Sequence, residues 1–123
     1  MSVAGATGEI GELTAAVFAA VNAEDPTRFA ALCAPEVEIH TARGVRRGRE
    51  EAADWVAKQY DNLLRRFLID SVAEAPRGGL AVVEARIRYL WREGEELADE
   101  SPIRLGVRFE ADLLAELRLE WPD

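Results

Sequence analysis

Only a few side chains in this 123-residue sequence could carry acid–base chemistry near neutral pH. His40 is the single histidine, and an imidazole titrates near neutrality without help from its surroundings. It alternates with Glu36 and Glu38, which favours a surface histidine on the outer side of a strand. If the strand end twists inward instead, His40 would serve as a base that Glu38 orients.

The two tyrosines, Tyr60 and Tyr89, are the other weak catalytic candidates. A phenol can donate a hydrogen bond to a ligand carbonyl, but each ring can equally well pack in the core with its hydroxyl at the rim. Cys33 falls on an apolar helix stripe, which predicts a buried, inert thiol. One cysteine and one histidine exclude a Cys/His zinc site, and we expect no metal and no cofactor.

Arg43, Arg46, Arg47 and Arg49 are a local reversal of charge just before a predicted helix. Together they could hold a phosphate or carboxylate at a helix N-terminus. No glycine-rich phosphate loop accompanies them, so we expect a solvated loop.

The charge balance excludes one large class of partner. The chain has 15 Lys+Arg against 23 Asp+Glu, a net charge of −8, which argues against nucleic acid because phosphate neutralisation needs surplus basic groups. With 49% hydrophobic residues it has the balance of a globular protein, and its length predicts one domain spanning residues 1–123. The longest apolar run, residues 15–21, is too short to cross a membrane. We expect a soluble, cytoplasmic protein.

Helical periodicity dominates the first half of the chain. Ile10, Leu13 and Val17 recur at three- and four-residue intervals and predict a first helix. Asp25-Pro26 is typical of the start of a helix, and we expect that second helix to end at Pro35. A third helix is expected to begin after Gly48 and to run as far as Leu63.

In other segments, apolar and polar residues alternate with a period of two. This alternation predicts strands at residues 36–41, 80–92, 103–109 and 113–121, and a weaker one at 67–74. Helices followed by antiparallel strands indicate an α+β domain with helices on one face of the sheet.

Three segments together resemble a known superfamily: FAAVNAED at 18–25, EVEIHT at 36–41 leading to GREEA at 48–52, and the final hairpin from VRF at 107–109 to LRLEW at 117–121. Their order and spacing resemble the nuclear transport factor 2-like superfamily, in its ketosteroid-isomerase-like and polyketide-cyclase-like (SnoaL-like) branch. The resemblance implies a cone: a strongly curved antiparallel or mixed sheet wrapped around three helices of the N-terminal half, enclosing an apolar pocket, often in a homodimer.

The catalytic positions of that superfamily are empty in this chain. By the resemblance, the isomerase base falls on Thr41, the tyrosine donor on Val17 and the carboxylic-acid donor on Leu105. None of these can exchange protons as the mechanism requires. The predicted inward strand positions also lack the aspartate of the cyclases and the Asp–Arg–Asp set of the epoxide hydrolases, unless a β-bulge turns Asp70 or Glu84 inside.

We therefore expect a protein that binds a small apolar or aromatic molecule without acid–base catalysis. Two alternatives stay open: an isomerase, cyclase or dehydratase acting on a polyketide-like or steroid-like substrate, and an association module whose cavity is filled by its own side chains. Arginine and glutamate alternate on the outer sheet face, and cross-strand ion pairs on a wet face are enough to explain this. The same face could also meet its copy, and we expect a homodimer, largely because the resemblance implies one. The expected pocket lining is Val17, Phe18, Thr41, Trp55, Gln59, Tyr60, Tyr89, Trp91, Leu105 and Val107.

Overall fold

The computed structural model describes residues 8–58, 62–73, 75 and 78–121. In those residues it contains three helices and six strands: α1 Gly8–Asn22, α2 Pro26–Ala31, β1 Cys33–Thr41, β2 Gly44–Arg47, α3 Gly48–Ala57, β3 Leu63–Val72, β4 Ala81–Trp91, β5 Leu97–Glu110 and β6 Leu113–Glu120. The prediction of an α+β fold with its helices in the N-terminal half is confirmed. Within the described residues, no helix is both long and apolar enough to span a membrane.

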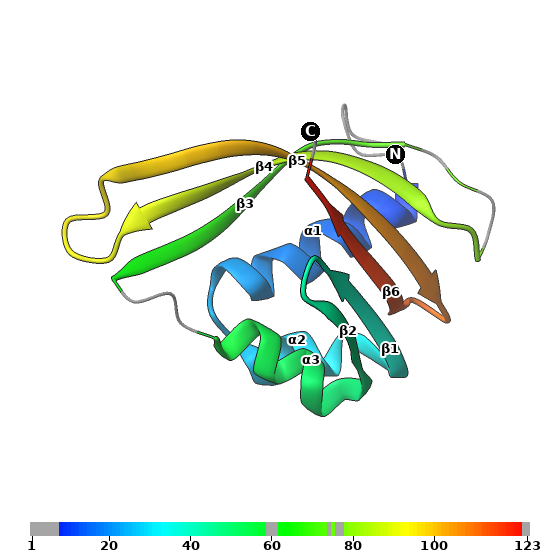
Figure 1. Cartoon of the computed structure of the whole chain (residues 1–123). Helices are drawn as coiled ribbons and strands as arrows, with labels where there is room; N and C mark the ends of the chain where they lie inside the picture. Colours follow the sequence, from blue (N-terminus) through cyan, green and yellow to red (C-terminus); the bar gives the residue numbers. More distant parts are fainter. Residues whose placement is uncertain (1–7, 59–61, 74, 76–77, 122–123) are drawn as a thin grey trace.

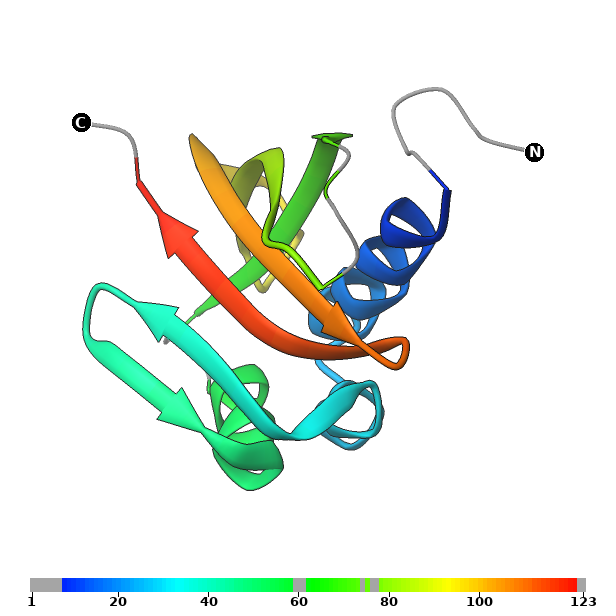
Figure 2. The ribbon, with the colours of Figure 1, turned by 90° about the vertical axis from the view of Figure 1, so that its right-hand side faces the viewer.

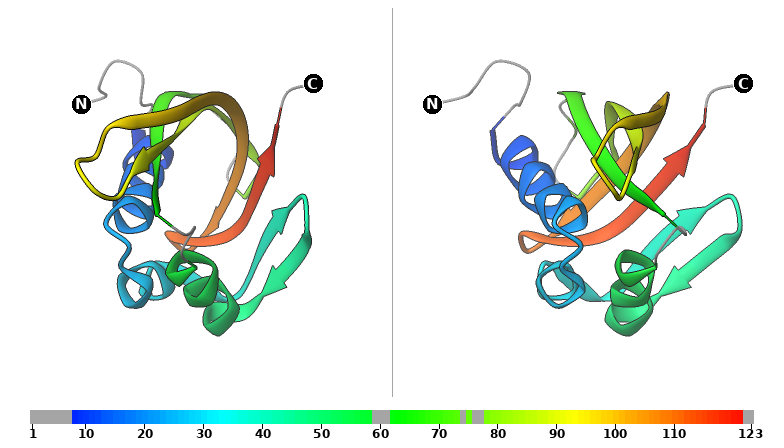
Figure 3. Two further views of the ribbon diagram at one scale, coloured as in Figure 1. Left: turned by 60° about the vertical axis from the view of Figure 1, so that its left-hand side comes forward. Right: turned by 90° about the vertical axis from the view of Figure 1, so that its left-hand side faces the viewer.

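The strands form one curved sheet in the order β2-β1-β6-β5-β4-β3. All neighbours are antiparallel except β1 and β6, which are parallel, so the sheet is mixed. It arches over the helices, which lie on its concave side (Figure 1). Further views from other sides show the strands curving around the helices as in a cone (Figures 2 and 3).

The interior of the cone is packed with apolar side chains. Four buried aromatic rings form a chain of contacts: Phe18 and Phe67 lie 5.0 Å apart between ring centroids, Trp55 and Phe67 6.4 Å, and Phe29 and Trp55 5.8 Å. Their side chains come from all three helices and from β3. The deep end of the cone is therefore core rather than open space.

The predicted third helix is wrong at its end. α3 stops at Ala57, and Leu63 opens β3, which ends at Val72 instead of running from 67 to 74. The alternation of this strand is hidden in the sequence because Arg65-Arg66 and Leu68-Ile69 each place two residues of similar type in succession. Its pairing with β4 is nevertheless regular from Leu63 to Ile69.

Two other boundaries differ from expectation. α2 ends at Ala31, before Pro35, and Cys33 is the first residue of β1 instead of part of a helix stripe. Arg46 and Arg47 are not in a loop; they belong to β2, a short edge strand paired with β1. The start of α2 is as expected, with Pro26 in its first turn and Asp25 accepting a hydrogen bond of 3.1 Å from the backbone N–H of Arg28.

Asn22, the last residue of α1, fixes this helix to β3. Its Nδ2 donates to the carbonyl oxygen of Phe67 at 2.8 Å, and its Oδ1 accepts from the backbone N–H of Phe67 at 2.7 Å. The side-chain amide thus pairs with one residue of the strand as a neighbouring strand would. Phe67 itself packs on Phe18 of the same helix, so the two contacts reinforce each other.

Replacing Asn22 with alanine should lower the free energy of unfolding by about 1–3 kcal/mol, because the half-buried N–H and C=O of Phe67 lose their partners. Urea denaturation followed by circular dichroism measures this change. Glu12→Gln, an exposed position on the same helix, serves as the control and should leave stability nearly unchanged. Equal midpoints for the Asn22→Ala variant and the unaltered chain would show that the contact contributes nothing.

Candidate functional site

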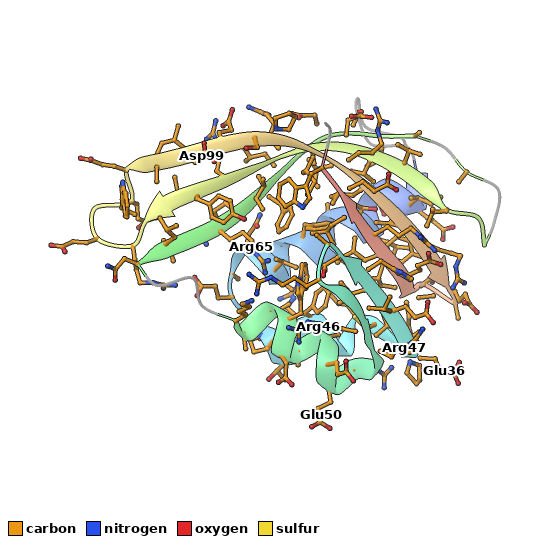
Figure 4. All side chains as sticks on the ribbon, in the orientation of Figure 1. Glu36, Arg46, Arg47, Glu50, Arg65 and Asp99 are labelled. Carbon is orange, nitrogen blue, oxygen red and sulfur yellow. The ribbon has the colours of Figure 1, made fainter. Side chains whose placement is uncertain are left out.

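A row of polar side chains crosses the concave face of the sheet. Arg65 of β3 pairs with Tyr89 of β4, and Tyr89 pairs with Asp99 of β5. Directly paired residues project to the same face, and the next pair inward, Phe67 with Ile87, is buried in the core, so this face is the concave one. In Figure 4, Arg65 lies on the helix side of β3 and Asp99 lies farther out on β5.

Arg65 is the one buried charged residue among those that the structure describes, with 9% of its surface exposed. Its guanidinium carbon lies 4.5 Å from the ring centroid of Trp55 and 5.4 Å from that of Phe67. Nη2 also donates to the carbonyl oxygen of Trp55 at 3.4 Å. Two aromatic faces and a carbonyl thus orient this cation, which is a favourable environment for a guanidinium.

Sequence reasoning missed Arg65 because it assigned the preceding residues to a helix. It also concluded that the inward positions carry neither an acid nor an arginine, and this conclusion is wrong on both counts. Arg65 and Asp99 occupy inward positions on strands that begin earlier than predicted. Arg65 could have been identified from the two-residue spacing of Leu63, Arg65 and Phe67, which places the three on one face of a strand.

An open recess lies beside this row, at the end where β4 turns into β5. Its volume is about 710 Å³, and it is lined by Asn62, Trp91, Arg92, Glu93 and Glu96. A second recess of about 10 Å³ lies deeper, between the ends of α1 and α3 and the start of β3, and has Arg65 and Arg92 in its walls. Arg92 borders both spaces, so the open recess and Arg65 belong to the same region of the cone.

Trp91 differs from the other predicted pocket aromatics. Phe18 and Trp55 are buried to 1% and 4% exposure, whereas 49% of Trp91 is exposed. The three rings therefore do not form one aromatic wall. Phe18 and Trp55 fill the deep part of the cone, and Trp91 stands at its open rim because it is the last residue of β4.

The remaining predicted lining residues lie in different surroundings. Val17, Leu105 and Val107 are core residues, each at most 2% exposed. Thr41 is the last residue of β1, where Oγ1 accepts from the backbone N–H of Arg43 at 3.2 Å and donates to the carbonyl of Gly44 at 3.3 Å. Tyr89 is half-buried on the concave face, while Gln59 and Tyr60 lie outside the described residues. Ligand contact at all these positions stays a prediction.

His40 lies on the outer face of the sheet, as the alternation predicts. Its Nε2 is 3.1 Å from Glu38 Oε1 and 3.9 Å from Glu116 Oε2, and both carboxylates belong to the same outer face. The alternative in which His40 turns toward the pocket as a base is therefore wrong for this structure.

β3 contains a β-bulge, but it brings neither Asp70 nor Glu84 inside. It lies between Ile69 and Ser71, and Asp70 remains outside, 2.9 Å from Arg86. Glu84 is likewise on the outer face, 2.8 Å from Arg104.

The four clustered arginines do not form one anion site. Arg47 approaches Glu38 at 3.4 Å on the outer face, while Arg46 pairs with Ile39 and so projects to the opposite face (Figure 4). Arg49 donates from Nε to the carbonyl oxygen of Cys33 at 2.8 Å.

Cys33 is a buried free cysteine. Burial raises the pKa of the Cys33 thiol to about 12, with Arg49 only partly opposing this, which agrees with the predicted inert thiol. In the part of the chain that the structure describes, no group of three or more His, Cys, Asp or Glu side chains could hold a metal ion.

The curved mixed sheet with its three helices is the fold of solved nuclear transport factor 2-like structures. A family model of the SnoaL-like domain matches residues 14–116, and the chain belongs to that family. No curated protein matches the sequence at significant similarity.

Solved structures with the same fold are distant in sequence. A hypothetical protein with a ketosteroid isomerase-like fold from Catenulispora acidiphila, solved in complex with trimethylamine, shares 18% identity at a TM-score of 0.75, covering 89% of this chain and 85% of that one. A proposed polyketide cyclase from Pseudomonas putida shares 22% identity at a TM-score of 0.72, covering 90% of each chain. Another proposed polyketide cyclase, from Sinorhizobium meliloti, shares 11% identity at a TM-score of 0.74, covering 89% of this chain and 94% of that one.

The acidic groups of the outer face predict a pH-dependent stability. Burial raises the pKa of Glu116, but hydrogen bonds from Arg118 and Arg108 outweigh it and leave the pKa below its usual value. Hydrogen bonds from His40 and Arg47 lower the pKa of Glu38 as well. Because both values are lower in the folded chain than in the unfolded one, this stabilisation is present above the ordinary glutamate pKa and is lost as the pH falls through the lowered values.

We expect the free energy of unfolding to fall between pH 6 and pH 3, and the fall to be smaller in the Glu116→Gln variant. Urea titrations at intervals of one pH unit measure both slopes, with Glu12→Gln as the exposed control. If the free energy of unfolding falls equally with decreasing pH in Glu116→Gln and in the unaltered chain, this carboxylate has no stabilising role.

Proposed function

We propose that this chain binds a small, largely apolar or aromatic molecule at the mouth of the cone, without acid–base catalysis. The observation that carries the proposal is Trp91. It occupies an inward-facing position of β4, yet about half of its surface is exposed. It also forms a wall of a recess of about 710 Å³. Ligand pockets commonly measure about 300–1,000 Å³ and combine aromatic walls with a few polar groups.

The packing of the interior determines where such a ligand would lie. Phe18, Trp55 and Phe67 occupy the deep part of the cone, so a ligand would rest above them, against Tyr89 and Trp91. The half-buried Tyr89 belongs to the same row as Arg65 and supplies a phenol that can donate a hydrogen bond. The complex of the Catenulispora acidiphila protein with trimethylamine supports small organic ligands for this fold.

One observation favours a second candidate, an enzyme of the isomerase or cyclase type. Asp99 shares a row with Tyr89 and Arg65, so a carboxylate base and two donors for an oxyanion lie on one face. Binding remains the better-supported function because Asp99 is exposed at the outer end of β5, whereas proton abstraction is favoured in a site that excludes water.

We also propose that the outer face joins two copies of the chain in a homodimer. Its charges alternate in sign, as in the pairs of Arg104 with Glu84 and Arg108 with Glu116, so the face is complementary to itself across a twofold axis. Val82 is 43% exposed on this face, and Leu80, 42% exposed, lies over Gly106 of the neighbouring strand. These two side chains supply an apolar centre among the ion pairs.

For the binding site, we expect 2-acetonaphthone, a neutral aromatic ketone, to bind the unaltered chain and Trp91→Ala to weaken its binding at least tenfold, or about 1.4 kcal/mol. Loss of the indole removes most of the aromatic wall. Isothermal titration calorimetry measures the dissociation constants. Val45→Ala removes an exposed apolar side chain from β2, outside the recess, and should leave the affinity unchanged.

Two results would count against non-catalytic binding at this site. An equal loss of affinity for the ketone in Trp91→Ala and Val45→Ala would exclude the recess as the binding site. Deuterium exchange of the ketone's methyl protons, accelerated by the chain and abolished in Asp99→Asn, would favour the enzyme instead.

For the dimer, we expect light scattering coupled to gel filtration to give twice the monomer mass of 13.6 kDa. Val82→Glu should shift the chain to monomers, because it buries an unpaired charge at the centre of the contact. Glu12→Gln should stay dimeric. A single 13.6 kDa species for the unaltered chain at tens of micromolar would contradict the proposal.

A further inference from the structure

The side chains that line the open recess indicate the charge of its ligand. We infer that the bound molecule is an organic ammonium ion whose apolar part lies on the indole of Trp91 while its cationic group faces the carboxylates of Glu93 and Glu96. This inference rests on the proposed binding function and adds a positively charged group to it.

The end of the β4–β5 hairpin places a carboxylate beside the indole. The backbone N–H of Trp91 donates to the carbonyl oxygen of Glu96 at 2.8 Å, and the preceding residue, Leu90, is paired with Leu97. Trp91 and Glu96 are therefore opposite each other, and opposite residues project to the same face with their β-carbons about 5 Å apart. Both side chains line the recess. A ligand that covers the indole there also meets a carboxylate.

Arg92 lines the same recess, but other groups already engage its guanidinium. Its Nη2 lies 3.5 Å from Oε1 of Glu24 and donates to the carbonyl oxygen of Leu63 at 3.4 Å. Glu24 is shared with Arg66, whose Nη1 lies 3.7 Å from Oε2. This group of two arginines and one glutamate therefore carries a single positive charge.

The carboxylates on the recess side outnumber that charge. Glu93 and Glu96 line the recess, and Asp99 lies on the same face farther along β5. In the part of the chain that the structure describes, none of the three has an ion-pair partner. The recess is therefore a region of negative potential, which attracts a cation and repels an anion.

The indole determines which kind of cation fits. Trp91 is 49% exposed at an inward-facing position, so its ring offers both apolar area and the negative face of its π system. A metal ion would use neither, and no group of three or more metal-ligating side chains occurs among the described residues. An ammonium group on an aromatic or aliphatic body uses the ring and the carboxylates together.

The test compares 2-naphthylmethylamine, which is protonated at pH 7, with 2-naphthalenemethanol, which has the same ring and a neutral hydroxyl in place of the ammonium group. In 50 mM NaCl, calorimetry should show the amine binding about tenfold more tightly than the alcohol. In the double variant Glu93→Gln/Glu96→Gln this preference should fall to about threefold or less, with little change in the affinity for the alcohol. Raising NaCl to 300 mM should weaken only the binding of the amine.

Two further variants provide the controls. Glu9→Gln/Glu12→Gln removes the same number of charges from exposed positions at the start of α1 and should retain the preference for the amine. Trp91→Leu keeps an apolar side chain without the π face and should weaken the amine more than the alcohol. Thermal unfolding verifies that each variant folds; if Glu93→Gln/Glu96→Gln does not, Trp91→Leu and the salt dependence of the unaltered chain decide the question.

The outcomes separate this inference from the function on which it rests. Equal affinity for amine and alcohol in the unaltered chain would overturn the cationic ligand and leave the binding function standing. An unchanged preference in Glu93→Gln/Glu96→Gln, or an equal loss in Glu9→Gln/Glu12→Gln, would also overturn it, because the effect would then belong to other groups or to net charge. Failure of the amine, the alcohol and 2-acetonaphthone to bind would reject the binding function itself.

Discussion

The position of Phe67 is the constraint on which most of this fold depends. Its backbone is held by both polar atoms of Asn22, and its ring contacts Phe18 of α1 and Trp55 of α3. One strand residue thus joins two helices to the concave face of the sheet. The residue two positions earlier must then face the same interior, because side chains on a strand alternate. That residue is Arg65, so the core packing itself places a cation inside the cone.

The same packing divides the cone into a filled and an open part. Aromatic rings from the three helices and β3 close the deep end, while β4 and β5 extend beyond the helices as a long hairpin (Figure 1). Trp91, at the end of β4, is not covered by any of the described helices and is half exposed. A recess forms at this overhang because the sheet is longer than the helices that fill it.

The sequence predicts a strand correctly only where apolar and polar residues alternate regularly along it. The segments at 80–92, 103–109 and 113–121 carry a regular two-residue pattern, and the structure contains strands there. The start of β3 is not predicted correctly because its charged and apolar residues come in adjacent pairs. Neither the helical period nor the two-residue period of a strand is therefore visible there. β2 is an exposed edge strand of four residues, for which burial leaves no pattern at all. The inward facing of Trp91 followed from alternation, but its exposure depends on where the helices end.

The two faces of the sheet accommodate their charged side chains in different ways. On the outer face, Arg86 and Arg104 each pair with a carboxylate of a neighbouring strand, and His40 lies between Glu38 and Glu116. Exposed pairs of this kind contribute little energy individually, but they satisfy the charges that a wet sheet face must carry. On the concave face, water is displaced by the core, and a charge there interacts more strongly with whatever approaches it. The contacts of Arg65 with Trp55 and Phe67 offset part of the cost of desolvating this cation.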